Sequence, residues 1–280
     1  MKLFQLVDTP KHQKDFDINQ HGRWYTWSQE IRPFLRSWNQ YVKTIEKPKL
    51  KSLNEAKPYV YTYSQNLSKI KEPQLCKELA SIATALNNLP VDDRILFFTG
   101  LLQDLDGVGL HFLFASLREA LVQIRKDPLS GLYSPLDPRG SKDFPLHCDL
   151  YVPKILFNVY EDVPTDSSGA SIFMSTQALK KILSNIRYLS IKNQNAILHS
   201  LSKESRRDRY DRFYDLLHGR HVWKDQLEEE MQKHQQRIKL DAGQGYMLHD
   251  RLWLHGREKV IGKIPRNRLH RLVFNNKSVN

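Results

Sequence analysis

The sequence predicts an α+β fold with a helical N-terminal part, a β-rich core built as a barrel or jelly roll, and a helical insertion within that core. Three observations predict it. Apolar residues recur at three- and four-residue intervals in the first 130 residues, whereas short β-rich segments separated by turns dominate residues 140–276. Between two of these segments, the polar stretch 176–236 returns to helical spacing. Although a length of 280 residues also permits two small domains, we expect a single domain over 1–280.

Helices are expected in three segments of residues 1–130. Apolar side chains fall on one face of Trp27–Val42, Pro73–Leu89 and Leu110–Ile124. Pro73 suits the start of its helix because the N–H groups of a first helical turn have no partner within the helix. We expect residues 1–130 to form an outer helical scaffold rather than a chemical centre.

The segment Asp127–Phe144 marks the entry into the β-rich core. Three prolines and two glycines interrupt any regular element there, which indicates a long loop. The segments that follow have the composition of strands bounded by turns. They are Lys154–Tyr160, Ala170–Met174, Ile238–Leu240, Gly245–Leu254 and Leu269–Phe274.

The insertion at 176–236 contains three stretches with helical spacing, namely Leu179–Ile186, Arg209–Leu217 and Trp223–Met231. Insertions carried by a rigid β-scaffold commonly form lids or substrate walls. A segment that serves only packing explains the pattern equally well.

The composition is that of an ordinary globular protein, with 40% hydrophobic and 26% charged residues. No apolar stretch approaches the roughly 18 residues that span a bilayer, so no membrane partner is expected. Cys76 and Cys148 are too few for a disulfide framework and lack the spacing of a zinc site. We therefore expect a cytoplasmic protein with free thiols.

A formal net charge of +12 raises the alternative of a nucleic-acid-binding or nucleic-acid-modifying protein. The densest basic stretches are Lys47–Lys51, Lys203–Arg212 and Arg257–Arg271. Of these, Lys203–Arg212 lies near Tyr210, Phe213 and Tyr214, where aromatic rings could stack on bases. The basic excess is spread along the chain, however. A solvated helix face or a pocket for an anionic substrate explains it more simply.

A candidate metal centre begins with His147-Cys148-Asp149, where the irregular segment meets the strands. Residues two apart in extended chain point to the same face, so the imidazole and the carboxylate can converge on one ion. His255 follows 108 positions later (255 − 147), at the end of the strand-like run Gly245–Leu254. Two histidines and one carboxylate form the facial triad that suits iron(II) and leave other coordination positions open.

The triad gains weight from its order with the rest of the chain, because His-x-Asp alone is common and His-Gly-Arg occurs three times here. Beyond His255 comes a strand dense in arginine, Arg266–Phe274. An arginine buried in a barrel strand needs a carboxylate partner. The far carboxylate of 2-oxoglutarate would supply one, since arginine binds carboxylates in a bidentate fork.

Four pieces of sequence together resemble the taurine dioxygenase and clavaminate synthase-like superfamily of Fe(II)/2-oxoglutarate-dependent dioxygenases. They are His147-Cys148-Asp149-Leu150, the segment Ser168–Phe173, the run GYMLHDRLWLHGR at 245–257, and RLHRLVF at 268–274. The resemblance covers 140–276 and implies a double-stranded β-helix (jelly roll) core within one catalytic domain. The helical first part is placed only by analogy.

The resemblance implies that His147, Asp149 and His255 ligate Fe(II), and that the hydroxyl of Ser171 approaches 2-oxoglutarate. Relatives commonly carry two arginines four apart on the last strand, and this chain does not. One alignment puts Asn267 at the first arginine's place, whereas counting from His255 selects Arg268. We take Arg268 as the first candidate for the 2-oxoglutarate anchor and Arg271 as the second.

The reaction implied by the resemblance is hydroxylation of an unactivated C–H bond with dioxygen, releasing succinate and CO2. Relatives that halogenate replace the carboxylate ligand with a small residue, so Asp149 favours hydroxylation. The expected substrate is a small molecule such as an amino acid, a carrier-tethered amino acid or a natural-product intermediate. A noncatalytic jelly-roll binding module is a further alternative, although an intact triad argues against it.

Three residues before His255 share its strand parity if Gly245–Leu254 is one strand. His249, Arg251 and Trp253 would then lie on the pocket side of the core. Packing or surface roles for them are the alternative.

Overall fold

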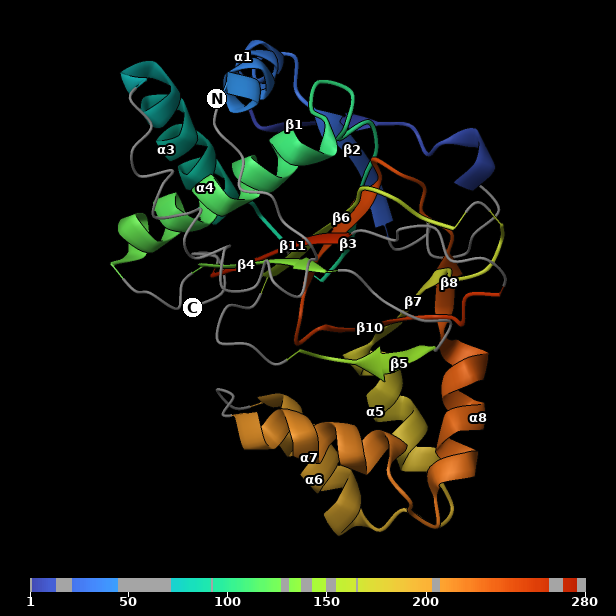
Figure 1. The fold of residues 1–280 in the computed structure, drawn as a ribbon. Helices are drawn as coiled ribbons and strands as arrows, with labels where there is room; N and C mark the ends of the chain where they lie inside the picture. The colour runs from blue at the N-terminus through green and yellow to red at the C-terminus, as the bar shows by residue number, and fades with distance from the viewer. Residues whose placement is uncertain are drawn as a thin grey trace.

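Two β-sheets lie between two groups of helices in the computed structural model of the chain (Figure 1). The structure describes residues 2–13, 22–44, 72–91, 93–126, 131–136, 143–149, 155–164, 166–202, 207–261 and 269–275, with the backbone alone at 131–136, 202 and 207–210. No helix in these ranges is both long and apolar enough to cross a lipid bilayer.

Within the ranges given above, the larger sheet has seven strands in the order β1-β2-β3-β9-β6-β11-β4. All neighbours in it are antiparallel except β2 and β3, which are parallel. In sheet order the strands are Phe4–Val7, Gly22–Trp27, Ile95–Phe98, Gly245–His249, Ile155–Tyr160, Leu269–Phe274 and Gly131–Leu136.

The smaller sheet has four antiparallel strands in the order β5-β10-β7-β8. These are Phe144–His147, Trp253–Arg257, Ser171–Ser175 and Gln236–Ile238. The inner faces of the two sheets share one hydrophobic cluster, in which Phe97 of β3 lies 6.0 Å from Phe173 of β7 between ring centroids. The sheets therefore form two layers, and inward side chains of either sheet can meet between them.

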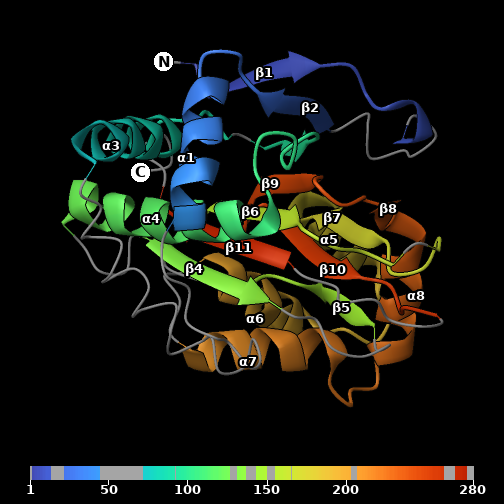
Figure 2. The ribbon, with the colours of Figure 1, turned by 45° about the horizontal axis from the view of Figure 1, so that its top comes forward.

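Helices α1 (Arg32–Thr44), α3 (Pro73–Asn87) and α4 (Gly107–Arg125) cover the outer face of the large sheet (Figure 2). Helix α4 begins at Asp106, whose carboxylate accepts the Gly109 N–H at 2.8 Å, a standard N-cap. Its apolar side chains join those of the outward residues of β6 and β11 in the largest buried cluster.

In its described residues the insertion forms four helices, α5 (Thr176–Asn185), α6 (Ile191–Ser202), α7 (Arg207–His218) and α8 (Lys224–His234). Helix α5 follows β7 directly, and Ser175 caps it by accepting the Ala178 N–H at 3.1 Å. These helices share a second buried cluster with outward residues of the small sheet, including Leu146, Ile172 and Leu254. The insertion therefore packs against the outer face of the small sheet.

The expectation that residues 1–130 are mainly helical was incomplete, because β1, β2 and β3 lie within them. Trp27 ends β2 and α1 starts only at Arg32, so the predicted helix Trp27–Val42 began too early. Strand β3 is a run of four buried apolar residues. Such a run has no periodicity that separates a strand from a helix.

The expected loop Asp127–Phe144 was also wrong, since it contains β4 and the start of β5. Pro135 lies within β4, which is the last strand of the large sheet. Proline is tolerated on such an edge strand because one side of the strand needs no partner for its N–H groups. Because the prolines were interpreted as interruptions of regular structure, neither β4 nor the start of β5 was predicted.

The single strand predicted over Gly245–Leu254 is in fact two strands in different sheets. Strand β9 ends at His249, a tight turn closes with the Leu252 N–H donated to the His249 carbonyl at 2.9 Å, and β10 begins at Trp253. Counting residues back from His255 therefore does not place His249 and Arg251 on the pocket side. The predicted strand Ile238–Leu240 likewise lies earlier, at β8.

Replacing Phe157 by alanine should lower the free energy of unfolding by about 3–5 kcal/mol, as is usual for a buried phenylalanine. Phe157 on β6 is 0% exposed, and its ring lies 4.9 Å from Phe98 and 5.2 Å from Phe114 between centroids. Urea denaturation measures the change. Leu6→Ala is the control, because Leu6 is 63% exposed and its loss should cost no more than about 0.5 kcal/mol. Equal effects of the two changes would contradict the assigned core.

Candidate metal centre

Three side chains converge at the end of strand β5, beside strand β10 of the small sheet. His147 ends β5, Asp149 follows two residues later, and His255 lies in the middle of β10. One possible ligand atom from each lies within 4.8 Å of the other two. The Asp149 carboxylate is 3.5 Å from Nε2 of His147 through one oxygen and 3.5 Å from Nε2 of His255 through the other. The three predicted ligands are therefore brought together in space.

Antiparallel pairing of β5 with β10 sets this meeting, because His147 and His255 are direct partners in the register. The pairing becomes irregular just beyond His255, between it and Arg257. Gly256 lies in this irregularity, and a Cβ there would come within 2.4 Å of the Phe144 carbonyl oxygen. The glycine of this His-Gly-Arg thus permits the close approach of the two strands.

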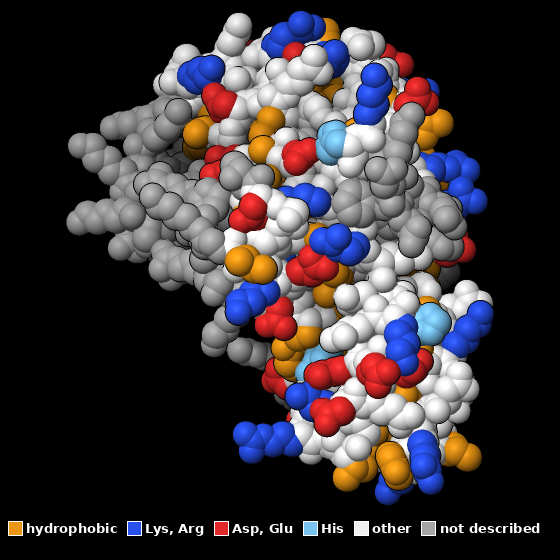
Figure 3. Space-filling model, turned by 90° about the vertical axis from the view of Figure 1, so that its right-hand side faces the viewer, with side chains coloured by type: hydrophobic (Ala, Val, Ile, Leu, Met, Phe, Trp, Pro, Cys, Tyr) orange, Lys and Arg blue, Asp and Glu red, His pale blue; other side chains and the backbone are white. Residues whose placement is uncertain are grey.

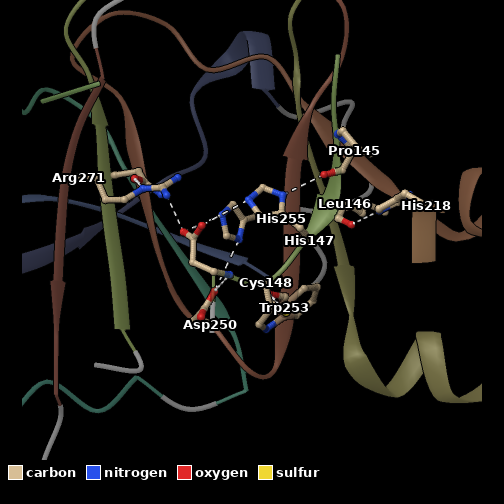
Figure 4. Close-up of polar contacts among 11 residues, drawn as sticks. Pro145, Leu146, His147, Cys148, His218, Asp250, Trp253, His255 and Arg271 are labelled. Atoms are coloured by element: carbon tan, nitrogen blue, oxygen red, sulfur yellow. Dashed lines mark hydrogen bonds and ion pairs between the residues drawn. The ribbon is translucent and has the colours of Figure 1, made fainter. Parts of the chain in front are cut away.

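Both imidazoles are buried and oriented with Nε2 toward Asp149. His147 is 1% exposed, and its Nδ1 lies 2.9 Å from the Pro145 carbonyl oxygen. Since a carbonyl can only accept, Nδ1 carries a proton, and Nε2 is the ring nitrogen that faces Asp149. Figure 4 shows the two rings side by side with this contact to Pro145. This tautomer is the one that can ligate a metal through Nε2.

His255 is 2% exposed, and neither ring nitrogen has a hydrogen-bond partner among the described residues. Burial, reinforced by the neighbouring His147, lowers its pKa to about 4. The ring is therefore neutral near pH 7. A buried neutral imidazole whose ring nitrogens lack hydrogen-bond partners is costly in free energy. A metal bound at Nε2 would supply the missing partner.

Asp149 supplies a negative charge at the centre of the cluster. Burial alone would raise its pKa, but the positive charge of Arg271 and the nearby imidazoles hold the pKa well below its ordinary value. Arg271 Nη1 lies 2.5 Å from one carboxylate oxygen, and the Asp149 backbone N–H is donated to Asp250 at 2.9 Å. The carboxylate is therefore ionised and fixed in place.

Cys148 lies between two of these ligands but points elsewhere. Its thiol belongs to the cluster on the outer side of the small sheet and lies 3.6 Å from the Trp253 carbonyl oxygen. Burial, and then the negative charge of Asp250, raise the pKa of the thiol well above its ordinary value. Cys148 is thus a neutral thiol and does not compete as a ligand.

A group of polar side chains lies between the two sheets beside the triad. Arg271 on β11 faces Asn158 on β6 and donates its Nε–H to the Asn158 side-chain oxygen at 2.9 Å. The hydroxyl of Ser171 lies 2.9 Å from that of Tyr160, and both residues are buried. These four side chains are polar groups among the mostly apolar side chains that the two sheets bury between them.

Sequence reasoning placed some of these residues and missed others. Asn158 and Tyr160 were missed, although a lone asparagine within an apolar strand was the signal available. Buried Asp250 was also missed. Trp253 donates its Nε1–H to the Asp93 carbonyl at 2.8 Å, while His249 Nδ1 accepts the Arg251 N–H within the turn at 3.2 Å. The first candidate for the anchor, Arg268, lies outside the described residues together with Arg266 and Asn267.

Comparisons with known proteins give structural matches only. No protein-family model matches the chain, and no curated protein sequence matches it. The solved structure of asparagine oxygenase (AsnO) superposes with a TM-score of 0.44 at 11% identity, covering 90% of this chain and 92% of that one. The non-heme iron oxygenase OrfP, in complex with Fe, succinate and (3S)-hydroxy-L-Arg, gives 0.42 at 10% identity, covering 90% and 94%. Similarity at this level is too loose to transfer a reaction to this chain.

The free energy of unfolding of the metal-free protein should fall as the pH is lowered from 6.5 toward 4. His255 binds a proton below about pH 6.5 in the unfolded chain but only near pH 4 in the folded one, so protons favour unfolding in that window. Urea denaturation in the presence of a chelator measures the slope. His255→Gln, which cannot titrate there, should show a shallower slope, and an unchanged slope would contradict the lowered pKa.

Proposed function

We propose that this protein is an iron(II)- and 2-oxoglutarate-dependent oxygenase that hydroxylates a C–H bond of a small molecule. One observation carries the proposal. Two buried imidazoles and an ionised carboxylate present ligand atoms within 4.8 Å of one another, and the ring nitrogens of His255 have no hydrogen-bond partner among the described residues. This donor set is that of the facial triad of non-haem iron(II) oxygenases.

The residues present fit such an ion in number, charge and orientation. His147 and His255 would each give Nε2, and Asp149 would give one carboxylate oxygen. Iron(II) bound there would supply, with 2-oxoglutarate and dioxygen, the oxidising power for C–H hydroxylation, with release of succinate and CO2. The carboxylate ligand favours hydroxylation over halogenation, since halogenases need that position open.

Arg271 is the better supported anchor for the far carboxylate of 2-oxoglutarate. It lies on the face of β11 that points between the sheets, its side chain is 15% exposed, and its guanidinium already holds one carboxylate, that of Asp149. A guanidinium has five N–H donors and can serve two oxygens at once. Ser171 and Tyr160 offer hydroxyl groups in the same space. Arg268 stays the alternative anchor.

The role of the protein around the ion is to hold these groups still and to keep water out. The triad side chains are 1–11% exposed, and the aromatic rings of Phe144 on β5 and Tyr246 on β9 lie beside His147 and His255. We propose that the two sheets are the layers of a double-stranded β-helix and that 1–280 forms one catalytic domain. The insertion shares a hydrophobic core with the small sheet, which supports a wall beside the site more than a mobile lid.

The substrate is proposed as a small molecule of the amino-acid or natural-product type, free or tethered to a carrier. The nucleic-acid alternative finds less support. Its basic cluster lies partly outside the described residues, and Arg212 is flanked there by Asp211. On the face seen in Figure 3, Lys and Arg side chains are interspersed with Asp and Glu rather than gathered in one basic patch.

Anaerobic addition of iron(II) and 2-oxoglutarate should produce the weak visible charge-transfer band of their chelate in the wild type. His147→Ala should abolish the band because it removes one of three ligands. His199→Ala, an exposed histidine on α6, is the matched control and should leave the band unchanged. Absence of the band in the wild type, or its survival in His147→Ala, would refute the proposal.

Arg271→Gln should raise the dissociation constant for 2-oxoglutarate about ten- to a hundredfold, the loss expected when hydrogen bonds to a charged group are removed. The chelate band, titrated at saturating iron(II), gives this constant separately from iron affinity. Arg237→Gln is the control, because Arg237 pairs with Glu258 at the surface. If Arg268→Gln weakens binding and Arg271→Gln does not, the anchor is Arg268.

A further inference from the structure

Asp250 is a carboxylate with no exposed surface in a turn that joins the two sheets. The turn runs from His249, the last residue of β9 in the large sheet, to Trp253, the first of β10 in the small sheet. Aspartate is common in turns, where its side chain usually meets water or the turn's own backbone. This one is buried and faces the metal centre instead.

One oxygen of Asp250 approaches two of the three proposed ligands. Its Oδ1 accepts the backbone N–H of Asp149 at 2.9 Å and lies 4.0 Å from Nδ1 of His255. Figure 4 shows the Asp250 side chain beside Cys148, below the two imidazoles. Asp250 thus ties the segment that follows β5 to the strand that carries His255.

The two histidines have matching arrangements on the side away from Asp149. Nδ1 of His147 faces the Pro145 carbonyl oxygen at 2.9 Å, and Nδ1 of His255 faces the Asp250 carboxylate at 4.0 Å. The second separation is within ion-pair range but too long for a hydrogen bond. An imidazole that gives Nε2 to a metal becomes a better N–H donor at Nδ1, and such second partners orient the ring.

We propose that Asp250 is a positioning residue for the metal centre, holding Asp149 through its backbone and His255 through its ring. The inference rests on the proposed function and adds to the three proposed ligands a side chain that positions two of them. With a metal bound at Nε2, the His255 Nδ1–H donates to Asp250 Oδ1. The negative charge of Asp250 then stabilises the positive charge that the metal brings into a buried site.

Two substitutions separate the contacts. Asp250→Asn keeps an oxygen that can accept the Asp149 N–H but removes the negative charge that faces His255. Asp250→Ala removes both. Asp104→Asn is a matched control, because Asp104 is a carboxylate of 9% side-chain exposure that pairs with Arg32 at 2.6 Å away from the triad.

The experiment titrates each purified protein with Co(II) alone, reading the visible d–d absorption that reports ligand geometry and the dissociation constant. Asp250→Asn should weaken Co(II) binding about tenfold and Asp250→Ala by up to about a hundredfold, with a changed d–d spectrum. Asp104→Asn should lower the free energy of unfolding while keeping the wild-type Co(II) affinity and spectrum. A role of Asp250 in stability alone would instead give the pattern of the control.

Wild-type affinity and spectrum in both folded Asp250 variants would overturn the inference and leave the proposed function standing. If the wild type binds no Co(II), or binds it equally well after His147→Ala, the proposed metal centre fails and the inference fails with it. Because Asp250→Asn is nearly isosteric, it provides the test even where Asp250→Ala does not fold.

Discussion

The pairing of β5 with β10 is the contact on which the candidate site depends. It places His147 opposite His255, two residues 108 positions apart (255 − 147), and leaves Asp149 in the chain just beyond the strand. The small sheet is completed by β7 and β8, and the insertion closes its outer face with a hydrophobic cluster. The intervening sequence therefore builds the support for the two strands that carry the candidate ligands, and Gly256 lets these strands approach closely.

Polar groups between two apolar sheets are costly unless they satisfy one another. Here Asp149 is held by Arg271 and Asp250, and Arg271 is held in turn by Asn158. These contacts fix the direction of the carboxylate, so an ion bound as we propose would need little reorganisation of this side chain. Burial also keeps His255 neutral and Cys148 protonated. The imidazole beside Asp149 is therefore available as a metal donor, and the thiol is not.

The sequence predicted the meeting of three side chains better than it predicted the strands. While their role as metal ligands stays a prediction, the meeting of His147, Asp149 and His255 was predictable because their residue types, order and two-residue spacing are those of a metal site. Strands β3 and β4 were not, since a four-residue apolar run and a proline-containing edge strand look like helix and loop without knowledge of their neighbours. Asp250 was hidden because a turn aspartate has an ordinary local explanation, and only the tertiary fold turns it inward.

The central place of β9 in the large sheet has a consequence for the order in which the chain can acquire its structure. Strand β9 pairs with β3 on one side and β6 on the other, so in the described part of the chain it alone joins the strands of the first 100 residues by backbone pairing to those after residue 130. During synthesis the pair β2–β3 leaves the ribosome about 150 residues before β9 (245 − 95) and has an open edge until then. Such long-range pairing slows folding, and an open edge favours aggregation. A chain cut short before Gly245 would lose His255 and the closure of that edge together.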